Sequence, residues 1–414
     1  MGLIEGISKD NASLCQMAQL SSMLAPTRTR RKRPVMELVR TNATNVFTSL
    51  QKALLYSCQS SHMASLYINP KSPQHENAKS PEGKESDTFR IVLQHSQMTG
   101  HSLQWHCNES EIRASDLTPK TSGTKSTKTV VTSRVRFADP NVNTFTCPTT
   151  RSGNTSTTSQ PASIVPEIQD LCSSISSLQS RECGVCLGYL ANALPTTRLG
   201  LFRPQAPIID KDSFSTLSLR DILDKKDGAP HLSVASRQRL AASLAIGLLR
   251  LHGTPWLNKQ WGHKEITFFS NGGRVLVEHP FLSTKLDTEI STNTTPSPAV
   301  YFTLSAAIRN ESLFALGILL IELCLHRPFE DLLLPVDLNT DGTKHATTEY
   351  CAALRLLDTI TGEVSLEYVE VTRQCIECHF NQGAASLDNE VFREAVYDNV
   401  VTVLEEEASR FARP

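Results

Sequence analysis

Residues 310–330, NESLFALGILLIELCLHRPFE, form the stretch that decides the fold. Their apolar side chains leave no polar stripe, and a helix that is apolar all round is a buried one. The run is too short for a membrane span, which needs about 20 apolar residues, and Glu322 interrupts it. Asn310 is suited to be the N-cap, and Arg327 before Pro328 predicts the end, because a residue before proline avoids helical angles. We therefore expect a central helix wrapped by others.

The composition of the 414-residue chain fits two to three domains, or one large two-lobed domain with disordered segments. A formal net charge of −1 gives no global field that would attract nucleic acid or membrane. Residues 1–10 lack the pattern of a secretory signal, and no apolar run reaches membrane-spanning length. We expect an intracellular protein, cytoplasmic or nuclear, without a membrane partner.

Eleven cysteines in an intracellular chain predict buried thiols rather than a disulfide framework. Two pairs have CxxC spacing, Cys183 with Cys186 and Cys375 with Cys378. They lie too far apart for a compact zinc site, and neither is followed by a histidine pair at ligand spacing. The second pair continues the apolar line of a helix, and the first precedes a strand-like run. The sequence therefore predicts no metal and no cofactor.

The N-terminal segment, residues 1–60, is predicted to be helical and basic. Residues 28–33 have the composition of a nuclear localisation or polyanion-binding patch. A solvated basic linker fits the same composition. Residues 35–58 then predict a helix. The basic side chains of the patch are Arg28, Arg30, Arg31, Lys32 and Arg33.

Residues 61–210 are predicted to be rich in strands. β-branched and aromatic residues favour strands, and alternating apolar positions mark the third of them. Residues 139–163 are dense in Ser, Thr, Asn and Pro, which predicts a disordered insertion. Apolar residues at helical spacing predict a helix over 166–180. The predicted strands are 62–68, 89–93, 130–137, 185–190 and 198–202.

Residues 211–414 are predicted to be mainly helical. Ser218 opens a capping box before a short helix, and Ser233 caps a longer one. Two strand-like runs, parted by the turn residues 271–273, precede the central helix. The whole chain is therefore α+β. The remaining expected elements are strands at 266–269 and 274–282 and helices at 351–360, 368–380 and 392–404.

This order of elements resembles that of a protein kinase domain. Three segments are also similar in sequence to kinase helices: SLRDIL with RLAASLAIGLLRLH, then SLFALGILLIELCLHRPFE, then EYVEVTRQCIECHF. The resemblance covers residues 166–404, and element order alone supports it over 60–140. It implies a protein-kinase-like two-lobed fold, with a small β-rich N-lobe at 61–210 and a larger, mainly α-helical C-lobe at 211–414.

LHGTPWLNKQW at 251–261 and EYVEVTRQCIECHF at 367–380 also resemble an uncharacterised family of fungal proteins. That family has a degenerate kinase-like C-terminal region. The resemblance implies a pseudokinase and a further N-terminal helical region, which would be short or missing here. It implies no activity.

Four parts that kinase catalysis requires are missing or altered. The chain has no GxGxxG in the predicted N-lobe and no Val-Ala-x-Lys. The run HKEI places Glu265 where the catalytic base would lie, and Asn271 follows one residue too late for the metal-binding asparagine. Glu278 opens EHPF, where DFG would lie. Beyond these four parts, Ser312 or Glu311 takes the place of the aspartate that starts the central kinase helix.

We therefore predict a non-catalytic, kinase-like (pseudokinase) module for protein interaction or signalling, with no catalytic residues and an unidentified protein partner. One alternative is a divergent active kinase that uses Glu265 as base and Glu278 as magnesium ligand. Another is a nuclear protein that binds nucleic acid through residues 28–33, whose phosphate contacts would be sensitive to salt.

Overall fold

The computed structural model describes residues 36–54, 61–68, 88–99, 102–116, 166–178, 182–191, 197–209, 214–258, 261–286, 307–380 and 385–411. The chain forms two compact units, residues 1–38 and 39–414. Every strand that the structure describes, and every described helix from residue 171 on, belongs to the second. The basic patch at 28–33, the strand predicted at 130–137 and the insertion predicted at 139–163 lie outside the described residues.

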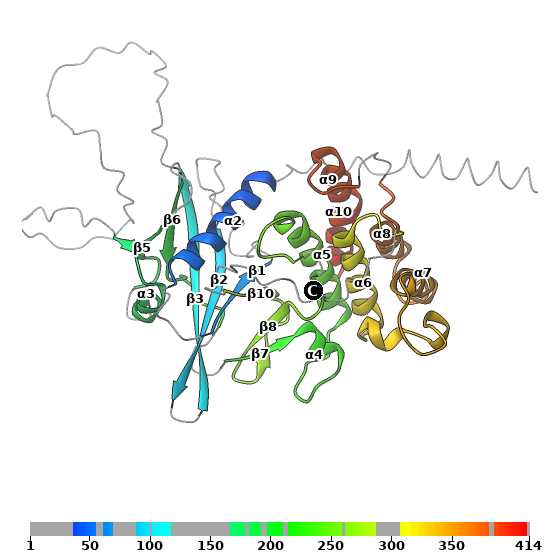
Figure 1. Ribbon diagram of the computed structural model, residues 1–414, viewed down its shortest axis with the longest axis horizontal. Coiled ribbons are helices and arrows are strands. Elements are labelled where there is room, and N and C mark those ends of the chain that lie inside the picture. The colour runs from blue at the N-terminus through cyan, green and yellow to red at the C-terminus, as the bar shows by residue number, and fades with distance from the viewer. Residues whose placement is uncertain are drawn as a thin grey trace, which may run out of the picture. The chain divides into compact units, whose positions relative to one another are not determined.

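The described strands form one ten-stranded sheet in the order β4-β5-β6-β3-β2-β1-β10-β8-β7, with β9 paired to β8 (Figure 1). The β4–β5 pair is parallel and the other pairs are antiparallel. The chain is thus α+β, as predicted, and its sheet is mixed. The strands are β1 (His62–Tyr67), β2 (Thr88–Thr99), β3 (Ser102–Asp116), β4 (Glu167–Ile168), β5 (Cys186–Leu190), β6 (Thr197–Phe202), β7 (Phe214–Ser218), β8 (Ile266–Asn271), β9 (Arg274–Val275) and β10 (Phe281–Lys285).

The sheet joins strands from both predicted lobe-like regions through the β1–β10 pair, in which Leu66 lies opposite Leu282. Apolar residues of β1, β2, β8 and β10 are buried on it. One cluster packs Phe269 edge-on to Phe281, with ring centroids 5.0 Å apart, against Val92. The strands expected at 62–68, 89–93, 185–190 and 198–202 are present.

The third strand along the chain, β3, was not predicted from the sequence. Its centre buries polar residues, Asn108, Glu109 and Ser110, so no alternation of apolar and polar side chains marks it. Glu109 is accommodated because Arg90 pairs with it and two distant N–H groups donate to it. Partners so far away in sequence leave no local signal.

The prediction of a single strand over 274–282 was wrong for the residues between β9 and β10. Gly272 and Gly273 have φ angles of +54° and +83°, which turn the chain tightly after β8. β9 then pairs for two residues, and the chain leaves the sheet until Phe281. Pro280, which has no N–H to donate, directly precedes β10.

The helices follow the predicted caps. Ser218, Ser233 and Asn310 each accept a hydrogen bond from a backbone N–H of the first turn, and the Ser218 capping box is complete. The helices are α2 (Met36–Lys52), α3 (Leu171–Leu178), α4 (Leu219–Leu223), α5 (Val234–Leu251), α6 (Glu311–Leu325), α7 (Thr348–Ile360), α8 (Leu366–Glu377), α9 (Glu390–Val396) and α10 (Thr402–Arg410), with 3-10 turns η2 (Phe329–Leu332) and η3 (Pro335–Asp337) and a π-helical turn η4 (Tyr397–Val401).

Helix α6 is the predicted central helix, and it contacts α5, α7 and α8 (Figure 1). Its end was predicted two residues too late. His326 adopts the left-handed conformation, with φ 56°, and so ends the helix before Pro328 can act. The Arg237 guanidinium on α5 donates to the carbonyls of Leu323 and Cys324, at 3.1 and 2.7 Å, and so satisfies the helix end.

Helix α5 also packs closely against the end of β1. A Cβ at Gly247 would lie 2.2 Å from Cγ2 of Ile68, so only glycine allows this approach. The part of α2 that belongs to the second unit is attached to the segment after α5. Trp256 Nε1 in that segment donates to the Ala43 carbonyl at 2.8 Å. None of the helices that the structure describes is both long enough and apolar enough to cross a membrane.

Candidate functional site

The 261–265 loop, which connects toward β8, holds the residues expected at a kinase catalytic loop. Two of its side chains attach it to α6. Trp261 Nε1 donates to the Ser312 carbonyl at 3.3 Å, and His263 Nδ1 lies 2.6 Å from Glu322 Oε1. Ser312 and Glu322 are ten positions apart, so the attachment points span about 15 Å of helix. The loop is therefore held at both ends of α6.

The His263–Glu322 pair is the buried centre of this attachment. Glu322 is fully buried, and its Oε1 also accepts the Phe329 N–H at 2.8 Å. Burial alone would lower the pKa of His263, but the hydrogen bond to Glu322 and its charge outweigh burial, so the pKa is raised. The imidazole is thereby favoured in its charged form, as the partner of a buried carboxylate.

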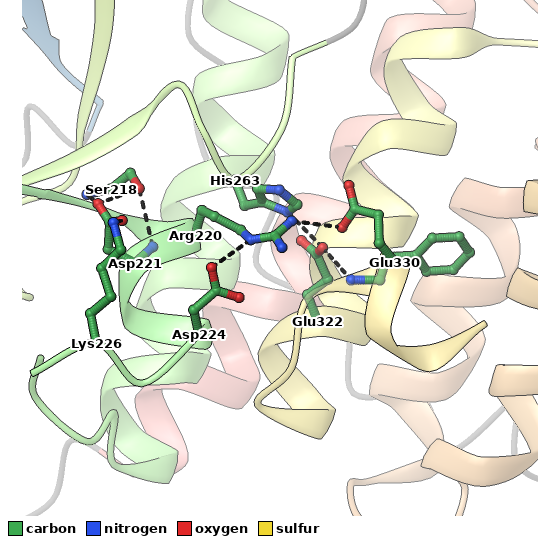
Figure 2. A network of polar contacts seen from close by, with 9 residues as sticks. Ser218, Arg220, Asp221, Asp224, Lys226, His263, Glu322 and Glu330 are labelled. Carbon is green, nitrogen blue, oxygen red and sulfur yellow. Dashed lines mark hydrogen bonds and ion pairs between the residues drawn. The ribbon is translucent and has the colours of Figure 1, made fainter. Parts of the chain in front are cut away.

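Figure 2 shows that this pair belongs to a larger polar network around the short helix α4. The Arg220 guanidinium on α4 pairs with Asp224 at 2.8 Å and with Glu330 at 3.0 Å, and the Arg220 N–H donates to the His263 carbonyl at 3.1 Å. At the start of α4, Ser218 and Asp221 form the capping box, and Lys226 pairs with Asp221. The network joins the β7–α4 corner, the 261–265 loop and η2.

Three members of the network bring potential metal-ligand atoms close together. The three residues are His263, Glu322 and Glu330, and one potential ligand atom of each lies within 4.8 Å of the other two. This group was found among the residues that the structure describes. Each side chain is already engaged: Glu330 by Arg220, and Glu322 Oε1 by two donors. The second carboxylate oxygen of Glu322, Oε2, is buried without a hydrogen-bond partner. The sequence did not predict these residues as metal ligands. The signal that could have pointed to them is Glu322, a carboxylate within an otherwise apolar helix.

Glu265, the predicted stand-in for the catalytic base, is turned toward its own loop. Its Oε2 accepts the Gly262 N–H at 2.9 Å, and its carbonyl accepts the Ser283 N–H at 2.9 Å. The side chain is half-buried. The carboxylate therefore caps the 262–265 turn, and the backbone carbonyl links the loop to β10.

Glu278, the predicted stand-in for the metal-binding aspartate, lies on the surface beside α5. Its Oε2 pairs with Arg239 at 3.1 Å and its Oε1 accepts the Ser236 hydroxyl at 3.3 Å. Asn271 donates instead to the Ile208 carbonyl, at 2.6 Å. No contact among the described residues joins Glu265 to Glu278, so the structure gives these three side chains separate partners.

A second charged pair, within the sheet, was not foreseen from the sequence. Arg90 on β2 pairs with Glu109 on β3 and also donates to the Ala206 carbonyl. Glu109 Oε2 accepts the N–H groups of Ile208 and Ile209, at 2.7 and 3.0 Å. Burial raises the pKa of Glu109, an effect that Arg90 and these N–H groups partly offset. The pair fixes the segment after β6 against the sheet.

Residues 35–411 match a family of proteins described as a domain of unknown function, DUF7580. The chain belongs to this family. The DUF7580 match spans every described helix and strand. No curated protein matches the chain.

Among solved structures, the chain is similar to a chain of the complex of Neurospora crassa PAN2 (WD40-CS1) with PAN3 (pseudokinase and C-term). The two are 10% identical, and the alignment covers 88% of this chain and 69% of that chain, with a TM-score of 0.28. A TM-score of this size does not establish a common fold.

Proposed function

We propose that this DUF7580 protein is a kinase-like module that acts by binding a protein partner and does not transfer phosphate. The observation that carries the proposal is the engagement of Glu265. A general base must lie within hydrogen-bond reach of the proton it removes. The carboxylate of Glu265 accepts instead from Gly262, inside its own turn.

The order of elements supports the kinase-like part of the proposal. Three strands, β1 to β3, precede α3 and the strands β5 and β6, and the short α4 and long α5 follow. The β8–β9 hairpin then leads to β10 and the buried α6. This is the order that the sequence resemblance implies, and the 261–265 loop lies where that order would place a catalytic loop.

The missing metal constellation supports the non-catalytic part. Kinase catalysis rests on positioned carboxylates that bring magnesium to the phosphates. Here Glu278 pairs with Arg239, and the Asn271 amide donates to a backbone carbonyl. Because Trp261 and His263 attach the loop to α6, moving Glu265 toward a substrate would disturb buried contacts.

A phosphotransfer assay on the full chain tests the proposal. The chain is incubated with γ-labelled ATP, magnesium and general protein substrates, beside Glu265→Gln and Glu278→Gln variants. We expect the same background transfer from all three proteins. Transfer by the wild type that both variants abolish would overturn the proposal and establish a divergent kinase.

The binding part is tested by chemical crosslinking of the full chain in cell extract, followed by mass spectrometry. We expect crosslinks from this chain to one recurrent protein partner, retained in the Glu265→Gln variant. A chain that crosslinks only to itself, at every concentration used, would contradict the binding role.

A further inference from the structure

Cys172 and His62 form a thiol–imidazole pair where α3 meets β1. Cys172 Sγ lies 3.1 Å from His62 Nε2. His62 is 7% exposed, whereas Cys172 is half-buried and is not in a disulfide. A thiol within reach of an imidazole can pass its proton to it, and the thiolate is the nucleophilic form.

The N-terminus of α3 and the carboxylate of Asp170 act on the pair in opposite directions. Cys172 lies in the first turn of α3, where the positive end of the helix favours a thiolate. Asp170 acts against this, although its Oδ1 accepts the N–H groups of Cys172 and Ser173, at 3.0 and 3.3 Å. On the sheet side, His62 lies opposite His95.

A row of three imidazoles thus crosses β1, β2 and β3, since His95 in turn lies opposite His106 and stacks on it at 5.1 Å. Burial, then the charges of His106 and His62, lower the pKa of His95. The lowered pKa keeps His95 in its neutral form at neutral pH, so it places no positive charge beside His62.

A small cavity reaches both members of the pair. Its volume is about 10 Å³, and its wall includes His62, His95 and Cys172 beside the apolar Leu93 and Ile175. A cavity of this size accommodates about one water molecule. A peptide or a nucleotide is too large for it.

We propose that Cys172 is a site of oxidation by hydrogen peroxide, with His62 as the group that accepts and returns the proton. His62 takes the proton of the Cys172 thiol, and the thiolate sulfur attacks one oxygen of the peroxide. The S–O bond forms as the O–O bond breaks, and the departing hydroxide takes the proton from His62 to become water. The thiol is oxidised to a sulfenic acid and the peroxide is reduced to water.

The other cysteines of the described residues make Cys172 distinct. Burial raises the pKa of Cys107, Cys186, Cys375 and Cys378, and that of Cys324 to about 11, so these thiols stay protonated. Cys183 and Cys351 are exposed, and no described contact places an imidazole on either. The inference does not depend on the proposed function, because neither His62 nor Cys172 belongs to the 261–265 loop.

Sulfenic acid trapping on the full chain tests the inference. The protein is treated with hydrogen peroxide near neutral pH in the presence of dimedone, and labelling of each cysteine is followed by peptide mass spectrometry. We expect Cys172 to be labelled about tenfold faster than Cys351, although Cys351 is the more exposed. Equal or slower labelling of Cys172 would overturn the inference.

Removal of the imidazole is the second measurement. His62→Gln should slow the labelling of Cys172 about tenfold and leave Cys351 unchanged. His379→Gln, which removes an exposed imidazole elsewhere, should leave both rates unchanged. A thermal melt checks that each variant is folded. Unchanged Cys172 labelling in folded His62→Gln would overturn the role of His62.

Discussion

Two carboxylates near the expected catalytic centre have opposite environments. Glu322 is fully buried and shares Oε1 between His263 and the Phe329 N–H. Glu278 and its partner Arg239 have side chains that are 47% and 44% exposed. Breaking a buried pair leaves an uncompensated charge, whereas an exposed pair is screened by water. The comparison teaches that the buried charge of this region holds the 261–265 loop, whereas the exposed charge of Glu278 is paired with Arg239 at the surface.

The largest expected effect follows from breaking the buried pair. Glu322→Leu should lower the free energy of unfolding by about 3–5 kcal/mol, because His263 loses its partner while it stays buried. Urea denaturation of wild type and variant measures the difference. The double variant Glu322→Leu/His263→Leu should recover part of the loss. A cost below about 1 kcal/mol for the single variant would contradict the claim that the buried pair stabilises the fold.

The pH dependence of stability tests the same pair through a smaller effect, whose direction is predicted. The folded-state pKa of His263 is raised above its ordinary value of 6.5, so its contribution is fully present below that value. It is lost as the pH rises through the folded-state pKa. The urea midpoint of the wild type should therefore fall as the pH rises from 6.5 through the folded-state pKa of His263. His263→Gln should lack this component, and identical pH profiles for the two proteins would contradict it.

An intermediate effect is expected at the edge of the network. Arg220 is partly exposed, and it pairs with both Asp224 and Glu330. Arg220→Ala should cost about 0.5–1 kcal/mol, because such pairs are screened. Glu349→Gln, at an exposed pair with Lys344, is a matched control that should cost less. A loss for Arg220→Ala as large as that for Glu322→Leu would erase the contrast between buried and exposed charge.

The smallest effect is expected at Glu278. Glu278→Gln should change the free energy of unfolding by no more than about 0.5 kcal/mol, since its pair with Arg239 is half exposed. Raising the salt concentration should reduce even this difference. A loss of several kcal/mol, measured by urea denaturation, would show that Glu278 holds structure as Glu322 does.

The helices were largely readable from the sequence because their signals are local. The apolar run of α6, the Asn310 cap and the Ser218 capping box all act within a few residues. Strand β1 was found for a similar reason. The end of α6 was placed too late, because His326 ends the helix by a backbone conformation that the following proline did not reveal.

The contacts that give charged residues their roles were not readable, because their partners are distant in sequence. Glu109 requires Arg90 and the N–H groups of Ile208 and Ile209. His263 requires Glu322, which lies 59 positions away. Sequence position placed Glu265 at the expected catalytic base, and only the structure shows that its carboxylate caps the Gly262 turn.

A thermal-shift titration with ATP, with and without magnesium, tests the central claim most directly. A ligand that binds only the native state raises its apparent stability, by about 2.7 kcal/mol at a hundredfold excess over Kd. Because Glu265, Asn271 and Glu278 are engaged elsewhere, we predict no magnesium-dependent rise in Tm at millimolar ATP. A magnesium-dependent rise that is lost in Glu265→Gln or Glu278→Gln would contradict the claim that the 261–265 loop is an anchor and not a catalytic loop.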